Sequence, residues 1–280
     1  MKISILGYGW FGSALGMSLL EDGHEINGSV TTEQKLEALC ATGIRASLIK
    51  LGGPEPLNPA ADFWDCDALV IASNVRLVAN PTYNDGLKQV IEIILSKCIK
   101  KTILISSTSV FGDTRQYVDE ISTCIPETGS GEILLQMESL FQQIPDGWST
   151  ALRFGGLVGP GRHPGRFFAG KKGVANGLAP VNLIHLDDCI GITKRLLQME
   201  RLPRCLNAVG PDHPSRAAFY TLAAEMQGLP IPEFIPEKLG WKIVGSKYNE
   251  EIGYKYLVND WESWLRSGSS QKLVEQVLSF

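Results

Sequence analysis

The feature that most constrains the fold of this chain is a glycine-rich turn at its beginning. Residues 2–12 read Lys-Ile-Ser-Ile-Leu-Gly-Tyr-Gly-Trp-Phe-Gly, an apolar segment that runs directly into a Gly-x-Gly-x-x-Gly turn and then an apolar helical pattern. In such a turn, Gly7 allows the tight bend, Gly9 lets the backbone approach a pyrophosphate, and Gly12 lets the helix pack close to the strand. The free N–H groups and the partial positive charge of the helix N-terminus attract phosphates. The sequence therefore predicts a dinucleotide-binding turn formed by Gly7, Gly9, Trp10, Phe11 and Gly12.

The overall composition excludes several classes of protein. A net charge of −4 argues against nucleic-acid binding and against a membrane-surface role. The sequence also has no apolar run near the ~20 residues of a membrane-spanning helix. The six cysteines are scattered without a Cys-x-x-Cys pair, which indicates free thiols and a cytoplasmic protein. The four histidines show no ligand spacing, so we expect no metal site.

Short apolar segments alternate with helical patterns along the chain. Strands are expected near 2–6, 25–29, 68–72, 102–106 and 149–154, and helices near 11–21, 32–41, 84–98 and 131–143. This alternation predicts an α/β fold with a doubly wound, Rossmann-like parallel sheet and helices on both faces. We expect a dinucleotide-binding domain over 1–155. A smaller, mixed C-terminal substrate region should span 156–280 and return to the core near 181–210.

Polar residues mark the beginnings of several expected helices. Thr32 precedes a helical pattern as an N-cap, and Ser215 does the same for residues 217–226. Asp187 and Asp188 are expected to cap a helix over 189–197, and a short terminal helix is expected over 271–278.

In sheets of this kind, ligands bind outside the carboxyl ends of the strands. The second expected strand ends without the acidic residue that usually hydrogen-bonds the ribose 2′-OH of NAD. Ser29, Thr31 and Lys35 would instead bind a 2′-phosphate, which favours NADP(H) over NAD(H). If Thr31 and Thr32 merely begin a helix, the preference stays open. Three further strand-end residues are expected to line the same groove: Ala72, Ser73 and Ser106.

Three later segments resemble one protein family. Residues 106–112 read Ser-Ser-Thr-Ser-Val-Phe-Gly and resemble the Ser-Ser-x-x-Val-Tyr-Gly signature of extended short-chain dehydrogenases/reductases, which include the NAD-dependent epimerase/dehydratase family. Residues 153–162 are similar to the family's Arg-…-Gly-Pro-Gly-Arg segment, and 182–188 are similar to its Phe-Ile-His-Val-x-Asp stretch. These segments follow the family's order. Residues 159–170 resemble in particular the YeeZ-type bacterial subgroup.

The resemblance implies a catalytic apparatus that this chain encodes only in part. In the family, a Tyr and a Lys four residues apart on one helix face supply the general acid/base, and a Ser/Thr hydroxyl orients the substrate. Ser107 occupies the hydroxyl position. Aligning Glu138 with the family's following acidic residue puts Leu134 at the Lys and Ser130 at the Tyr. Neither residue can titrate near neutral pH, so the usual Tyr-x-x-x-Lys pair is absent from this alignment.

Other residues are candidates for the missing chemistry. Tyr83, near the position of a structural Asn in the family, could place a phenol at the site, although an aromatic residue at a helix start is also typical of packing. Arg162, His163 and Arg166 lie in a Pro/Gly-rich loop and would suit a small anionic substrate, because guanidinium groups bind carboxylates and phosphates. The alternative is a solvated basic loop in which His163 is a hydrogen-bonded structural residue.

Three functions therefore stay open. The first is an NAD(P)-dependent oxidoreductase or epimerase-like enzyme without the usual Tyr-x-x-x-Lys pair. The second is a catalytically silent nucleotide-binding or sensor protein. The third is a different enzyme class, because the opening segment alone resembles β-hydroxyacid or 6-phosphogluconate dehydrogenases. Those proteins need a long all-helical C-terminal domain, which the remaining segments of this chain do not supply. The family resemblance also implies a homodimer paired through the helices near 84–98 and 131–143.

Overall fold

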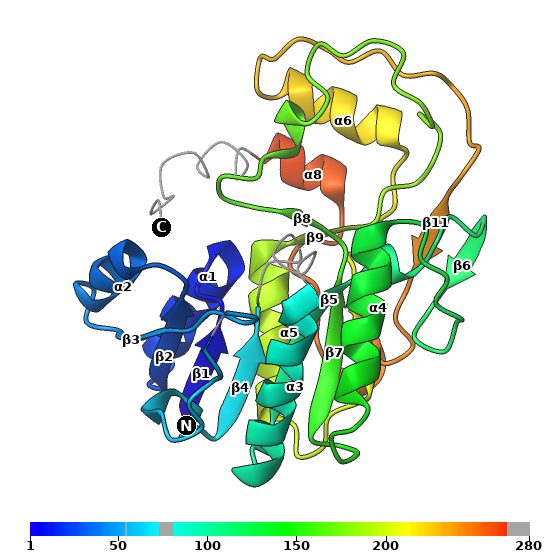
Figure 1. Ribbon diagram of the computed structural model, residues 1–280. Coiled ribbons are helices and arrows are strands. Elements are labelled where there is room, and N and C mark those ends of the chain that lie inside the picture. Colours follow the sequence, from blue (N-terminus) through cyan, green and yellow to red (C-terminus); the bar gives the residue numbers. More distant parts are fainter. Residues whose placement is uncertain (54, 73–80, 268–280) are drawn as a thin grey trace.

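A parallel sheet of seven strands forms the centre of the computed structural model, which describes residues 1–53, 55–72 and 81–267 (Figure 1). The strand order is β10-β7-β5-β4-β1-β2-β3. The strands are β1 (Lys2–Leu6), β2 (Glu25–Val30), β3 (Arg45–Leu48), β4 (Ala68–Ile71), β5 (Thr102–Ser107), β7 (Ser149–Phe154) and β10 (Cys205–Ala208). The direction of winding reverses between β1 and β4, which are adjacent. The predicted doubly wound parallel sheet is therefore confirmed, with its switch point at the end of β1.

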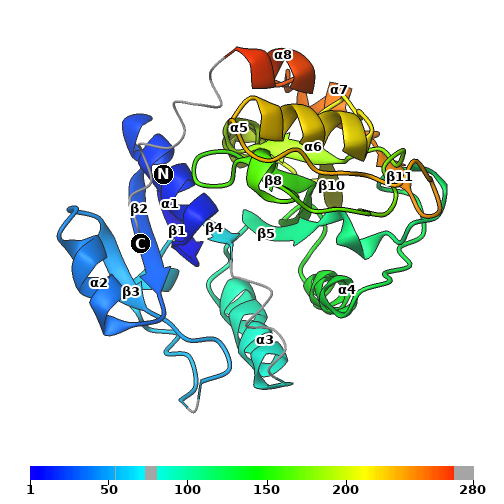
Figure 2. The ribbon, with the colours of Figure 1, turned by 90° about the horizontal axis from the view of Figure 1, so that it is seen from above.

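Helices cover both faces of the sheet (Figure 2). They are α1 (Trp10–Glu21), α2 (Glu33–Cys40), α3 (Pro81–Ser96), α4 (Gly129–Phe141) and α5 (Leu186–Gln198). The strands alternate between two apolar clusters. Val70 packs with α1 and α5, whereas its neighbour Leu69 packs on the other face with α3 and α4. Both side chains are completely buried, as is usual for strands of a parallel sheet.

All five expected strands are present, but the sequence did not predict β3 and β10. Each has only four residues, and each lies at an edge of the sheet. The Thr32 cap is confirmed because its Oγ1 accepts a hydrogen bond from the Lys35 N–H at 3.4 Å. The Ser215 cap of α6 (Arg216–Glu225) is confirmed in the same way. The expected helix over 271–278 lies outside the described residues.

The expected cap of α5 is wrong. The helix begins at Leu186, and its N-cap is His185, whose Nδ1 accepts from the Asp187 N–H at 3.2 Å. Asp188 is completely buried and instead binds the segment after α7 (Asn249–Ile252), accepting from the Tyr254 hydroxyl at 2.9 Å and the Leu257 N–H at 2.7 Å. A carboxylate that the sequence pattern assigns to a helix end thus joins distant parts of the chain.

The C-terminal part of the chain lies above the carboxyl ends of the strands (Figure 1). Helix α6 and helix α8 (Trp261–Arg266) share a third apolar cluster there. Two small parallel pairs complete the fold: β8 (Gly156–Val158) with β9 (Leu183–His185), and β6 (Gln116–Val118) with β11 (Lys242–Val244). Within the described residues there are also short 3-10 turns: η1 (Asp62–Trp64), η3 (Thr108–Val110) and η4 (Pro164–Arg166). Helix α5 and strand β10 return to the central sheet, where β10 pairs with β7.

The helices of the described ranges include none that is both long and apolar enough to cross a lipid bilayer.

Candidate functional site

The glycine turn links β1 to α1 at the switch point of the sheet. Gly7 has φ = 102°, in the left-handed region that favours glycine. Its N–H donates to Ser29 Oγ at 2.9 Å, which ties the turn to the end of β2. A β-carbon at Gly12 would collide with the carbonyl oxygen of Gly7, whereas no heavy atom lies within 4 Å of one at Gly9. The three glycines thus have the surroundings expected of a tight bend, an open approach and a close helix contact.

Tyr8, which lies between the first two glycines in the sequence, packs against the helix and the strand next to the turn. Its side chain lies between α1 and β2, because a β-carbon at Gly16 or at Gly28 would collide with it. Burial raises the pKa of the Tyr8 phenol to about 12. Tyr8 is therefore a packing residue whose phenol stays protonated near neutral pH.

The first turn of α1 presents backbone donors at this point. The first intrahelical bond runs from the Ser13 N–H to the Gly9 carbonyl oxygen at 2.8 Å. The N–H groups of Trp10, Phe11 and Gly12 therefore have no acceptor within the helix. The first turn contains no acidic residue that would compete for them. This helix end is suited to an anion.

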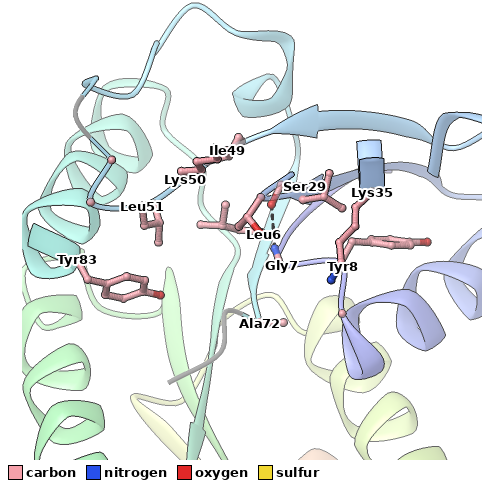
Figure 3. A pocket seen from close by; sticks show the side chains of 15 residues that line it. Leu6, Gly7, Tyr8, Ser29, Lys35, Ile49, Lys50, Leu51, Ala72 and Tyr83 are labelled. Carbon is pink, nitrogen blue, oxygen red and sulfur yellow. Dashed lines mark hydrogen bonds between the residues drawn. The ribbon is translucent and has the colours of Figure 1, made fainter. Parts of the chain in front are cut away.

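A pocket of about 550 Å³ opens beside the glycine turn, within the usual volume of small-molecule sites (Figure 3). The carboxyl ends of β1, β2, β3 and β4 and the beginning of α3 form its walls. The lining residues are Leu6, Gly7, Tyr8, Gly9, Ser29, Val30, Thr31, Lys35, Ile49, Lys50, Leu51, Gly52, Gly53, Ala72 and Tyr83. These include two lysines and no carboxylate, so the described lining carries a positive charge.

The structure brings together many of the residues that the sequence singled out. Gly7, Gly9, Ser29, Thr31, Lys35, Ala72 and Tyr83 line this one pocket. Tyr83 lies opposite Lys35 across it (Figure 3). Ser73 lies outside the described residues. Lys50 and the loop around it were not predicted as part of the site, because the short strand β3 that precedes them is not evident in the sequence.

Ser106 and Ser107 do not line the pocket, and each hydroxyl has another partner. Ser106 is buried, and its Oγ donates to Glu138 at 2.5 Å. Glu138 in turn accepts bidentate hydrogen bonds from the guanidinium of Arg153, and the shorter of them measures 2.6 Å. Ser107 points to the opposite face of β5, and its Oγ accepts from the Ser109 N–H at 3.2 Å as the N-cap of η3. Their predicted roles stay predictions.

Helix α4 contains neither Tyr nor Lys. Ser130, aligned with the family's Tyr, is exposed in the first turn, and Leu134, aligned with the Lys, is buried in the apolar cluster with α3. A β-carbon at Gly131 would collide with the carbonyl oxygen of Ser109, so this part of α4 lies directly against the end of β5 and η3. At this junction the chain provides a tight backbone contact and no titratable pair.

The basic loop after β8 also lies outside the pocket. His163 is buried, its Nδ1 accepts from the Gly165 N–H at 3.1 Å, and its ring stacks on Trp264. Burial, with the charge of Arg166 nearby, lowers the pKa of His163 to about 4. Arg162 and Arg166 are exposed. His163 thus has the geometry of a structural cap, and the two arginines are the cations that this loop presents.

The described part of the chain brings no three His, Cys, Asp or Glu side chains together in a way that could bind a metal ion.

Comparison with known proteins identifies the family to which the chain is related. No protein-family model matches the chain. Protein YeeZ of Escherichia coli (strain K12) is 38% identical over 267 residues, which cover 92% of this chain and 97% of YeeZ.

Solved structures share the fold at lower sequence identity. UDP-glucuronic acid 4-epimerase from Bacillus cereus, in complex with NAD, has a TM-score of 0.77 at 18% identity and covers 98% of this chain and 99% of its own. A functionally unknown conserved protein from Silicibacter pomeroyi DSS has a TM-score of 0.77 at 20% identity, over 97% and 98% of the two chains. The chain belongs to the family of protein YeeZ and has the fold of the NAD-dependent epimerase/dehydratases, the extended short-chain dehydrogenases/reductases.

Proposed function

We propose that this chain binds a nicotinamide dinucleotide, NADP(H) in preference to NAD(H), and acts as an oxidoreductase or epimerase-like enzyme on a small anionic substrate. One observation carries the proposal. The pocket at the switch point of the sheet adjoins the glycine turn and is lined by Lys35 and Lys50 without any carboxylate.

The residues of the pocket fit the dinucleotide. The N–H groups of the first turn of α1 would hold the pyrophosphate, and the open space over Gly9 would let it approach the backbone. Lys35 lies at the start of α2 and Lys50 just after β3, so both would reach the 2′ position of the adenosine ribose together with Thr31. One structural relative supports the dinucleotide as the ligand, since UDP-glucuronic acid 4-epimerase was solved with NAD.

When bound, the nicotinamide would supply hydride transfer, and the chain must supply the proton. Tyr83 is buried, lines the pocket and is our candidate acid. Ser107, at the end of β5, would orient a substrate oxygen as the family's hydroxyl residue does. Arg166, in the exposed basic loop, would bind the anionic group of the substrate.

A second function is favoured by one specific observation. Helix α4 carries no Tyr and no Lys, so a protein that binds the dinucleotide without turning over a substrate fits the same pocket.

By resemblance we also propose a homodimer. The six cysteines, all unpaired, favour the cytoplasm.

The cofactor preference is tested by titrating NADPH and NADH into Lys35→Ala and Lys50→Ala variants. Each substitution should weaken NADPH binding by about tenfold, because a charge-assisted contact is lost, and should leave NADH binding within about twofold. Lys88→Ala, which removes an exposed lysine of α3, is the matched control. Equal losses for both cofactors, or no loss for either, would overturn the proposed 2′-phosphate contact.

The two candidate functions differ in turnover. With a panel of anionic carbonyl compounds and sugar nucleotides, an oxidoreductase predicts net oxidation of NADPH, whereas an epimerase-like enzyme predicts inversion at a substrate carbon without net oxidation. Tyr83→Phe and Ser107→Ala should reduce either reaction at least about 100-fold. The sensor function predicts saturable binding and neither reaction with any compound. Turnover that neither substitution affects would remove both residues from the proposed chemistry.

A further inference from the structure

Ser29, the fifth residue of β2, is hydrogen-bonded to the glycine turn at two points. Its Oγ accepts from the Gly7 N–H at 2.9 Å (Figure 3), and its carbonyl oxygen accepts from the Tyr8 N–H at 2.8 Å. Successive N–H groups of an extended strand point to opposite sides, so one neighbouring residue can bind two of them only where the chain bends. The bend lies at Gly7, whose φ is 102°. Ser29 therefore holds the turn at the residue where the chain leaves β1.

The residue before Ser29 makes room for the same turn. A β-carbon at Gly28 would lie 2.5 Å from the ring of Tyr8, so a glycine lets this ring pack against β2. Gly28 thus accommodates the Tyr8 side chain, while Ser29 binds the backbone of Gly7 and Tyr8. Two adjacent residues of β2 together fix the position of the turn relative to the sheet.

The Ser29 side chain is almost completely buried, in contrast to Thr31. Ser29 borders the pocket but is only 2% exposed, whereas Thr31, two residues later, is exposed. The sequence predicts that both hydroxyl groups bind a 2′-phosphate. Burial separates their roles, because a phosphate in the pocket can reach Thr31, whereas the Ser29 oxygen is directed to the backbone of the turn.

The position of Gly7 determines the position of the helix donors. Gly12 of α1 lies so close to the Gly7 carbonyl oxygen that a β-carbon at Gly12 would be 2.3 Å from it. The first turn of α1, whose N–H groups would hold the pyrophosphate, is therefore packed directly on Gly7. A residue that holds Gly7 in place also holds these donors in place.

We propose that Ser29 is a positioning residue for the pyrophosphate, which it serves through Gly7, and that it does not contact the 2′-phosphate. This inference rests on the proposed dinucleotide function and divides the site between two hydroxyl residues. Ser29 sets the geometry of the pyrophosphate turn, and Thr31 is the hydroxyl that binds the 2′-phosphate beside Lys35 and Lys50.

The test compares ligands that contain different phosphates. NADPH contains both the pyrophosphate and the 2′-phosphate, ADP-ribose contains only the pyrophosphate, and adenosine 2′-monophosphate contains only the 2′-phosphate. Ser29→Ala should weaken NADPH and ADP-ribose by about tenfold and leave adenosine 2′-monophosphate within about twofold. Thr31→Ala is the matched comparison and should show the opposite pattern, weakening NADPH and adenosine 2′-monophosphate but not ADP-ribose.

Amide hydrogen exchange tests the contact itself. In Ser29→Ala the Gly7 N–H loses its acceptor and should exchange at least about tenfold faster than in the wild type. The Tyr8 N–H is the internal control, because its acceptor is the carbonyl oxygen of residue 29, which the substitution keeps. A general loss of stability would accelerate both amides and would not discriminate between the ligands.

Three results would contradict the inference. Ser29→Ala could leave ADP-ribose binding unchanged, it could weaken adenosine 2′-monophosphate as much as NADPH, or it could leave the Gly7 exchange rate unchanged. The failure of the proposed function is a different result, because the wild-type protein itself would then bind none of the three ligands.

Discussion

Gly12 lies so close to the carbonyl oxygen of Gly7 that no β-carbon fits between them. The obstructing atom belongs to the backbone of the turn, so a rotamer change cannot relieve the contact. The end of β1, the turn and the first turn of α1 therefore form one unit. In this unit the position of the helix donors depends directly on two glycines.

Replacing Gly12 by Ala should displace α1 from the turn. We expect a loss of about 1–3 kcal/mol in the free energy of unfolding, measured by urea denaturation, and loss of NADPH binding. Gly9→Ala is the matched control, since no heavy atom lies within 4 Å of its β-carbon. The free energy of unfolding of Gly9→Ala should stay within about 0.5 kcal/mol of the wild-type value. The variant should nevertheless bind NADPH about tenfold more weakly, because its methyl group occupies the space through which the phosphate approaches the backbone. A stable Gly12→Ala protein with normal binding would contradict this view of the turn.

Glu138 and Arg153 form a buried ion pair, and each side chain should depend strongly on the other for its contribution to the free energy of unfolding. Both side chains are less than a tenth exposed, and removing either partner leaves a buried charge unpaired. Glu138→Leu and Arg153→Met should each cost about 3–5 kcal/mol in the free energy of unfolding.

The double variant is the control for this prediction. It removes both charges, so it should be less destabilised than the sum of the two single variants by at least about 1 kcal/mol in urea denaturation. Simple additivity would show that the two side chains do not stabilise each other.

Much of the fold could be predicted because the strongest sequence signals are local. All four residues of β4, for example, are apolar, and Leu69 and Val70 are buried on opposite faces of the sheet. The edge strands β3 and β10 were missed because each mixes polar with apolar residues over only four positions. The cap of α5 was misplaced because Asp188 is acidic and near a helix start, but its partners, Tyr254 and Leu257, lie far along the chain.

The candidate site could be predicted only where residues follow strands that the sequence itself indicates. Gly7, Gly9, Thr31 and Ala72, which the sequence singled out, line the pocket. Lys50 was missed because it depends on β3. The contact of Arg162 with Trp10 could not be predicted either, because nothing in either local sequence indicates that the two segments meet.

His163 should make stability depend on pH. Its pKa is about 4 in the folded protein and near the ordinary 6.5 in the unfolded chain, so the unfolded chain takes up a proton first as the pH falls. The stability contribution is therefore complete above about pH 6.5 and is lost progressively down to about pH 4. The maximum loss is about 3 kcal/mol.

His163→Asn isolates this effect, because Asn can also cap η4 but does not titrate. Urea denaturation of the wild type and the variant at several values of pH should show a smaller decrease in stability for the variant between pH 6.5 and 4. Parallel curves for the two proteins would contradict the assignment of a buried, neutral imidazole.

The pocket beside Lys35 and Lys50 should bind a nicotinamide dinucleotide. This is measured by titrating the purified, folded protein with NADPH and with NADH and following nicotinamide fluorescence. We predict saturable binding of both, with NADPH bound about tenfold or more tightly. If neither cofactor binds saturably, or if NADH binds more tightly than NADPH, the result contradicts the proposed function or its proposed cofactor preference, respectively.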